Sequence, residues 1–149
     1  MLSPHKFVLL VEDSSDEVFL FQRACVKAGV TFGLNVARNG YEALGYLKGE
    51  GEYVDREKFP LPTAIVLDLN MPGISGFEVL EWIRSSPLHQ YLVVIIFSAS
   101  SLESDIRKAY TLAANSYLAK PLNPLALVEI AAMIDRYWMN LNLPLRALT

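Results

Sequence analysis

The alternation of short apolar runs with stretches of helical periodicity constrains the fold of this chain most strongly. Five segments are predicted to be strands, at 7–11, 32–38, 64–67, 92–97 and 116–119. Helical patterns follow them at 14–29, 41–48, 76–86, 102–114 and 124–140. Strands that alternate with helices imply a parallel sheet with helices on both faces. We therefore expect a single α/β domain of five strand–helix units with right-handed connections.

Local signals support the first helix and indicate where the chain leaves the core. Ser14 and Glu17 have the spacing of a capping box, and Gly29 is typical of a residue that ends a helix. Cys25 lies on the apolar face of this helix and is expected to be a small core residue rather than a reactive thiol. The segment 49–62 carries two glycines, two prolines and six charges, which favours a solvated loop.

Composition excludes several classes of protein. The chain has 149 residues, of which 52% are hydrophobic and 11% aromatic, so intrinsic disorder is excluded. The longest apolar run, Leu92–Phe97, is far below the roughly 18 residues of a membrane span. No signal-peptide pattern opens the chain, and a cytoplasmic location is expected. The net charge is −3 without a basic stripe, so neither nucleic acid nor a membrane is an expected partner.

Polar side chains stand at the carboxyl ends of four predicted strands. They are Glu12 and Asp13, Asp68, Ser98 and Lys120. In open parallel sheets the carboxyl ends of the strands border the crevice in which ligands bind. The second strand ends at Arg38 and lies at the sheet edge if the strand order is 2-1-3-4-5. The sequence therefore predicts one polar site assembled from four separate strand ends.

The chemistry of these groups points to phosphoryl transfer. Three neighbouring carboxylates repel one another, so they raise each other's pKa values or require a cation. Oxygen ligands without Cys or His favour a hard ion such as Mg²⁺. Lys120 can neutralise charge on an incoming phosphoryl group, and Ser98 can hydrogen-bond one of its oxygens. Positioning and charge neutralisation supply most of the catalysis in such transfers, and an aspartate is a competent acceptor.

Four motifs in order resemble those of the receiver domain of bacterial two-component response regulators. They are Val11-Glu12-Asp13, Asp68-Leu69-Asn70-Met71-Pro72-Gly73, Phe97-Ser98-Ala99 and Tyr117-Leu118-Ala119-Lys120-Pro121. The resemblance covers about residues 6–140. It implies a flavodoxin-like (βα)5 doubly wound parallel sheet in the order 2-1-3-4-5. The expected organisation is a receiver domain at 1–140 and a C-terminal tail at 141–149.

The resemblance also implies a role for each matching residue. Asp68 would accept the phosphoryl group from the phosphohistidine of a sensor histidine kinase in a Mg²⁺-dependent phosphorelay. Mg²⁺ would be held by Asp13 and Asp68 through their side chains, by Asn70 through its backbone carbonyl, and by Glu12 mainly through water. Many family members have Asp at the position of Glu12, and the charge is retained here.

The remaining implied roles concern the phosphoryl group and the response to it. Ser98, Ala99 and Lys120 would bind the phosphoryl group, and a cis peptide would join Lys120 to Pro121. Ser98 and Tyr117 would form the switch, with Tyr117 turning inward when Ser98 moves. The alternative for Tyr117 is an ordinary half-buried aromatic on an edge strand.

The predicted last helix is apolar over about twice the roughly 100° that packing on one sheet face requires. This surplus, with the leucines of the tail, predicts a homodimer that the tail helps to form; the alternative is a tail folded back on its own domain. More narrowly, the 11–16 opening, the 49–62 segment and this helix resemble the stand-alone receivers that partner bacterial phytochromes. That likeness implies a light-sensing kinase as phosphodonor. Only nine residues follow Asn140, so no DNA-binding module is expected in this chain.

Two other functions compete with a phosphoacceptor that catalyses its own phosphorylation and dephosphorylation. A phosphohydrolase with an aspartyl nucleophile usually needs a second acid two residues later, and Asn70 occupies that position. A receiver-like adaptor that works without phosphorylation would not need the complete set of acids, Ser98 and Lys120. Nucleotide-binding folds lack support because no glycine-rich turn follows the first strand.

Overall fold

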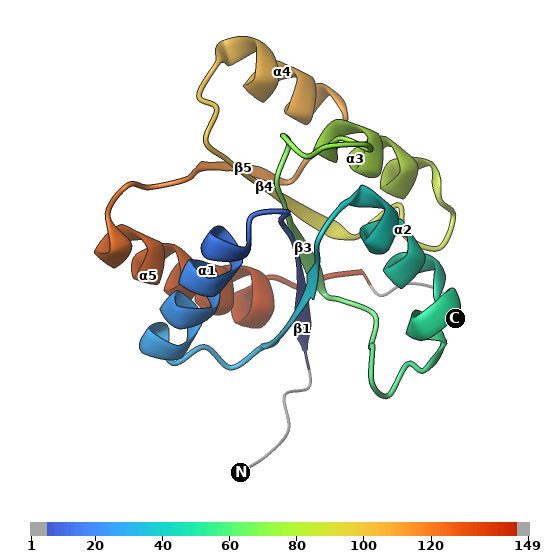
Figure 1. Ribbon diagram of the computed structural model, residues 1–149, viewed down its shortest axis with the longest axis horizontal. Helices are drawn as coiled ribbons and strands as arrows, with labels where there is room; N and C mark the ends of the chain where they lie inside the picture. Colours follow the sequence, from blue (N-terminus) through green and yellow to red (C-terminus); the bar gives the residue numbers. More distant parts are fainter. Residues whose placement is uncertain (1–5, 146–149) are drawn as a thin grey trace.

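In the computed structural model, which describes residues 6–145, five parallel strands form one sheet in the order β2-β1-β3-β4-β5 (Figure 1). The strands are β1 (Phe7–Val11), β2 (Gly33–Ala37), β3 (Ala64–Leu67), β4 (Val93–Ser98) and β5 (Ser116–Ala119). The helices are α1 (Ser15–Ala28), α2 (Gly40–Lys48), α3 (Gly76–Ser85), α4 (Glu103–Thr111) and α5 (Pro124–Met133). The expected fold class and strand order are confirmed.

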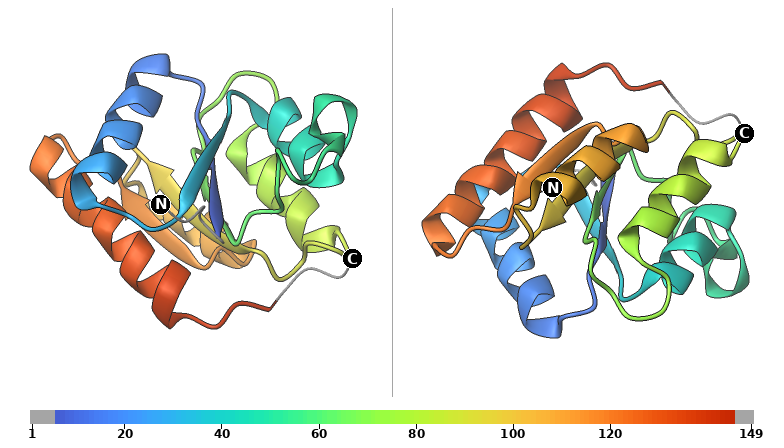
Figure 2. Two further views of the ribbon diagram at one scale, coloured as in Figure 1. Left: turned by 90° about the horizontal axis from the view of Figure 1, so that it is seen from below. Right: turned by 90° about the horizontal axis from the view of Figure 1, so that it is seen from above.

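Helices cover both faces of the sheet, with α1 and α5 on one side and α2 and α3 on the other (Figure 2). Alternate residues of each strand enter different cores. In β1, Val8 and Leu10 pack on the α1–α5 side, whereas Leu9 and Val11 pack on the α2–α3 side. Because both faces are buried, the inner strands are continuous apolar runs rather than alternating ones. None of the helices in the described part of the chain is long and apolar enough to cross a membrane.

Only half of the predicted capping box forms at the start of α1. The hydroxyl of Ser14 accepts a hydrogen bond from the Glu17 N–H at 3.3 Å. In a complete capping box the N–H of Ser14 would donate to the Glu17 carboxylate. Here it donates to Glu12 Oε2 at 3.1 Å instead. The carboxylate of Glu17 is therefore available for another partner. At the other end, Gly29 adopts the left-handed conformation, with φ of 66°, as the predicted helix stop requires.

The segment 49–62 is a loop whose charged residues other than Arg56 are exposed, as a solvated loop predicts, but it is also anchored to the domain. Its short 3₁₀ turn, η1 (Gly51–Val54), carries Tyr53, which is buried. The Tyr53 ring lies 5.1 Å from that of Tyr46 and 5.0 Å from that of Phe59, measured between centroids. Arg56 donates hydrogen bonds to the carbonyls of Tyr46 and Leu47 in the last turn of α2, where the Tyr46 carbonyl also accepts from the Gly49 N–H. The spacing of these aromatic residues follows neither a helix nor a strand, so the sequence pattern did not reveal the cluster.

The predicted last helix does not run uniformly to Asn140. After α5 the chain continues as a π-helical turn, η2 (Ile134–Leu141). A π-helical turn bonds residues five apart, and it brings Ile134 and Met139 into the core together. Asn140 supports the turn, since its side-chain amide donates to the Asp135 carbonyl at 2.6 Å. Thr31, from the turn before β2, donates to the Asp135 carboxylate at 2.8 Å and fixes the turn against the domain.

Candidate functional site

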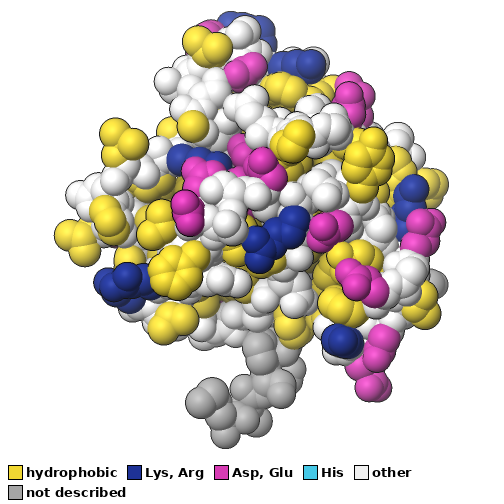
Figure 3. Space-filling view, in the orientation of Figure 1, with side chains coloured by type: hydrophobic (Ala, Val, Ile, Leu, Met, Phe, Trp, Pro, Cys, Tyr) yellow, Lys and Arg dark blue, Asp and Glu magenta, His cyan; other side chains and the backbone are white. Residues whose placement is uncertain are grey.

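The carboxyl ends of the inner strands bring carboxylates and an ammonium group together, as predicted. Lys120 Nζ lies 2.6 Å from Glu12 Oε1, 2.9 Å from Glu17 Oε2 and 3.6 Å from Asp68 Oδ2. Glu12 and Asp68 are neighbours because the register pairs Val11 of β1 with the last residue of β3. On the face of the molecule shown in Figure 3, acidic side chains and a basic one lie together above the middle of the view.

The site is buried, and burial dominates its electrostatics. Glu12 is 3% exposed, Asp68 is 6% exposed and Ser98 is fully buried. Burial raises the pKa of Glu12 even though Lys120 donates a hydrogen bond to it, and burial likewise raises the pKa of Asp68. For Lys120, burial by itself would lower the pKa, but hydrogen bonds to Glu12 and Glu17, together with the negative charges of Asp68 and Glu12, outweigh it and raise the pKa. The lysine is therefore charged.

The donor chemistry fits a hard divalent cation. Glu12, Glu17 and Asp68 each place a carboxylate oxygen within 4.8 Å of the others. One ammonium group faces three carboxylates, so the site has an excess of negative charge that a further cation would relieve. The gathered ligand atoms are all oxygens, the type that Mg²⁺ prefers. The residues present therefore fit the predicted metal.

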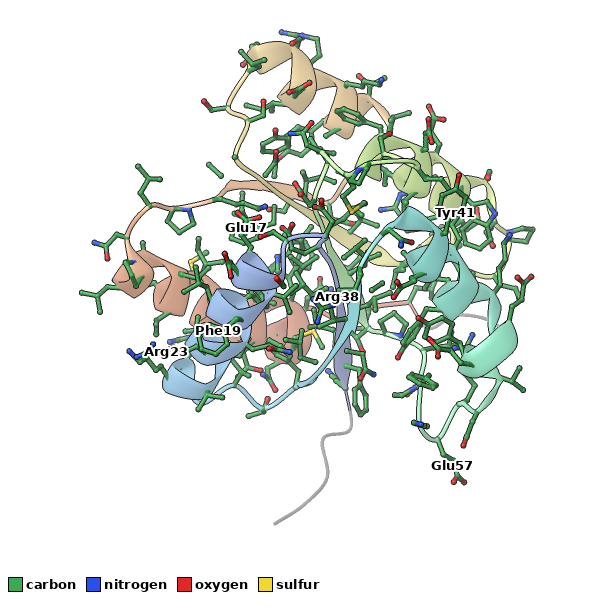
Figure 4. All side chains as sticks on the ribbon, in the orientation of Figure 1. Glu17, Phe19, Arg23, Arg38, Tyr41 and Glu57 are labelled. Atoms are coloured by element: carbon green, nitrogen blue, oxygen red, sulfur yellow. The ribbon has the colours of Figure 1, made fainter. Side chains whose placement is uncertain are left out.

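Glu17 is the residue that sequence reasoning missed, and Asp13 lies outside the gathered group. Glu17 was assigned only to the helix cap, and no sequence signal points from α1 to the end of β5. Figure 4 shows Glu17 at the end of α1 that lies near the site. Asp13 is exposed and is not one of the three gathered carboxylates. It is near enough for its charge to raise the pKa of Asp68, although burial is the larger cause.

The turn after β3 holds Asp68 in place. The N–H of Asn70 donates to Asp68 Oδ1 at 3.4 Å, so the backbone of Asn70 lies beside the carboxylate. Gly76, the first residue of α3, lies against the backbone of Asp68 and Leu69, and its N–H donates to the Leu69 carbonyl at 3.1 Å. A Cβ atom at Gly76 would collide with the Asp68 carbonyl oxygen, so glycine is required by close approach.

Hydrogen bonds connect the predicted switch residues through Ser100. The Ser98 hydroxyl accepts from the Ser100 N–H at 3.1 Å, and Tyr117 donates its hydroxyl proton to the Ser100 carbonyl at 2.8 Å. The Tyr117 ring is partly buried against the α2–α3 core, whereas Ala99 is exposed. Ser98 and Tyr117 therefore hold the same short segment between β4 and α4.

The expected cis peptide between Lys120 and Pro121 is wrong for this structure. No peptide bond among residues 6–145 is cis. Cis and trans X–Pro bonds differ by only about 0.5–1 kcal/mol, so the surroundings rather than the sequence select the isomer.

The fold and this arrangement define the class of the protein: the chain belongs to the response regulator receiver domain family, whose model matches residues 8–132. It is 34% identical to the response regulator Rcp1 of Synechocystis over 92% of this chain and 91% of that protein. The structure of the Mn²⁺-bound form of Rcp1 matches with a TM-score of 0.82 and 33% identity, covering 94% of this chain and 99% of the other.

Two further solved structures resemble the chain. One is the phosphorylated cyanobacterial phytochrome response regulator RcpA, with a TM-score of 0.85, 36% identity and coverage of 94% of this chain and 98% of the other. The second is the response regulator RPA3017 in red light signaling of R. palustris, with a TM-score of 0.90, 30% identity and coverage of 95% and 99%. The chain is thus a receiver homologous to phytochrome response regulators.

Proposed function

We propose that this chain is a single-domain response regulator that accepts a phosphoryl group on Asp68 from a sensor histidine kinase in a Mg²⁺-dependent phosphorelay. The observation that carries the proposal is the burial of Asp68 beside a second carboxylate and the ammonium of Lys120 at the carboxyl ends of the strands. A phosphoryl group on Asp68 would lie within reach of Lys120. The proposal places the chain in the cytoplasm.

In the proposed transfer, the Asp68 carboxylate attacks phosphorus and forms a P–O bond while the P–N bond of the phosphohistidine breaks. The electron pair of that bond leaves with the imidazole. A Mg²⁺ ion held by Glu12, Asp13, Asp68 and the Asn70 carbonyl would neutralise phosphoryl oxygens. Lys120 supplies a second positive charge, and its hydrogen bonds to Glu12 and Glu17 keep it protonated.

The proposed switch follows from the shared attachment to Ser100. The Ser98 hydroxyl would turn to a phosphoryl oxygen, with the Ala99 backbone beside it, and thereby give up its bond from Ser100. Tyr117 holds the carbonyl of the same residue, so its hydroxyl would move with the segment. The surface formed by α4 and β5 would change shape as a result.

The direct test is labelling with radioactive acetyl phosphate in Mg²⁺. The wild type is expected to incorporate label that EDTA prevents, and Asp68→Asn is expected to incorporate none. Asp55→Asn is the matched control, because it makes the same chemical change at an exposed position in the 49–62 segment. Label on Asp68→Asn would defeat the assignment. A wild type that neither labels nor binds Mg²⁺ would favour the alternative, a receiver-like adaptor that works without phosphorylation.

A groove beside the site supports docking of the kinase. It lies between α1 and the start of α5, with apolar walls that include Leu20 and Leu125 and with Arg23 and Lys27 as basic groups. Leu122, two residues after Lys120, is fully exposed at the groove. Because relatives are named as phytochrome response regulators, we propose a phytochrome-like kinase as the donor.

Phosphotransfer from such a kinase should exceed transfer from a chemotaxis kinase. Leu122→Ser should slow phosphotransfer from the phytochrome-like kinase without changing labelling by acetyl phosphate.

Apolar residues at four-residue spacing support the proposed homodimer through the last helix. Met133, Tyr137 and Leu141 are 59%, 51% and 63% exposed. In the tail, Leu143 and Leu145 are also exposed, whereas residues 146–149 lie outside the described part. Such a stripe fits the same surface of a second copy.

The homodimer is tested by measuring mass against concentration by analytical ultracentrifugation, with and without beryllofluoride. Tyr137→Glu should give monomers. Tyr110→Glu, which changes an equally exposed tyrosine on α4, should remain dimeric. A monomeric wild type at micromolar concentrations in both states would refute the dimer.

A further inference from the structure

Lys120 divides its charge among three carboxylates, and the phosphoacceptor has the weakest contact. Nζ is within hydrogen-bond distance of Glu12, at 2.6 Å, and of Glu17, at 2.9 Å. The nearest oxygen of Asp68 is 3.6 Å away, which is too long for a hydrogen bond. The ammonium group has three N–H donors, and Glu12 and Glu17 take two of them, so a phosphoryl group on Asp68 would gain more than the third donor only if one of these acids gave its own up.

The two competing acids differ in what their release costs. The side chain of Glu12 is 4% exposed, whereas that of Glu17 is 43% exposed. A buried carboxylate that loses its counter-ion is strongly destabilised, because water cannot replace the lost interaction. A half-exposed carboxylate regains water, so its ion pair is worth little. Glu17 is consequently the partner that Lys120 can leave most easily.

The local structure leaves the Glu17 carboxylate without a competing partner in α1. Its backbone N–H is already fixed by the Ser14 hydroxyl, so its position on the helix is set. The backbone donor that a capping box would offer, the Ser14 N–H, is bonded to Glu12. The carboxylate can therefore move between Lys120 and solvent without unwinding the first turn of α1.

We propose that Glu17 is a displaceable counter-ion that holds Lys120 while Asp68 is unmodified and releases it to the phosphoryl group. The inference rests on the proposed function, since it assumes that Asp68 becomes phosphorylated. Glu17 is a positioning residue that acts through Lys120. Release also leaves a negative charge unpaired in the first turn of α1, next to the exposed Phe19 and Leu20, so this surface of α1 reports the state of Asp68.

The test is calorimetric titration with beryllofluoride, a phosphoryl mimic, at saturating Mg²⁺. Glu17→Gln keeps the size of the side chain and removes the charge that competes for Lys120. It is expected to bind beryllofluoride about three- to fivefold more tightly than the wild type, in line with a partly exposed ion pair. A gain in affinity is a readout that structural damage would not produce. Asp16→Asn is the matched control, because it removes one charge from the same helical turn at an exposed residue that is not among the acids paired with Lys120. Its affinity is expected to change less than twofold.

The results of these titrations test the proposed function and the counter-ion role of Glu17 separately. A wild type that fails to bind beryllofluoride refutes the proposed function itself. If the wild type binds but Glu17→Gln matches Asp16→Asn or binds more weakly, the counter-ion role is wrong. A separate titration with Mg²⁺ alone should give affinities for Glu17→Gln and Asp16→Asn that agree within twofold. A selective loss of Mg²⁺ affinity in Glu17→Gln would make Glu17 a metal ligand and overturn the inference.

Discussion

Replacing Arg56 should reveal how firmly the 49–62 segment is attached to the domain. The guanidinium donates to the carbonyls of Tyr46 at 2.8 Å, Leu47 at 3.0 Å and Phe59 at 3.1 Å. Arg56 thus joins the end of α2 to Phe59 in the later part of the 49–62 segment. Arg56→Met keeps a flexible apolar stem and removes all three donors.

The expected cost follows from these contacts. A hydrogen bond from a charged group contributes about 1.5–3 kcal/mol to the free energy of unfolding, so the loss of three such bonds has an upper limit about three times as large. Arg56 is only half-buried, so water reaches some of the released carbonyls and the loss is smaller. We expect Arg56→Met to lower the free energy of unfolding by about 2–4 kcal/mol. In a domain of this size the melting temperature should fall by roughly 5–15 °C.

Urea unfolding followed by circular dichroism measures this free energy, and amide hydrogen exchange should show faster exchange across 49–62. Lys58→Met is the matched control: its ammonium lies 5.4 Å from the Phe59 ring centroid on an exposed side chain, and a loss below about 1 kcal/mol is expected. Equal stabilities of the two variants would refute the idea that Arg56 anchors the segment.

Three further outcomes are expected. Gly76→Ala should lower the unfolding free energy by about 3 kcal/mol in urea titrations and slow labelling of Asp68, because its Cβ meets the Asp68 carbonyl; a stable, fully labelled variant would contradict this. Burial lowers the pKa of His89, so stability present above pH 6.5 should be lost on acidification, by at most about 1.4 kcal/mol per pH unit, and His89→Gln should lose less. Burial raises the pKa of Cys25 to about 12, so iodoacetamide at pH 8 should modify it only in urea-unfolded protein.

The sequence determined the fold class and the centre of the site. Strands buried on both faces must be short apolar runs, and these alternate with helical patterns. In a parallel sheet the polar residues at the carboxyl ends share one edge, so the sequence alone predicts that Glu12, Asp68 and Lys120 lie together, as they do. These inferences depend on local periodicity and topology, both of which a single sequence carries.

Tertiary structure decided what depends on side-chain reach and on contacts between distant segments. Glu17 has ordinary capping-box spacing, and only the folded chain brings the end of β5 to its carboxylate, 103 residues away in sequence. Arg56 and Tyr53 do not follow a helical or strand periodicity that would predict their packing. The peptide bond before Pro121 is trans, and because the two isomers differ little in free energy, the surrounding structure selects between them. Local pattern specifies where an element lies, whereas the partner of a long polar side chain is fixed only when the whole domain is assembled.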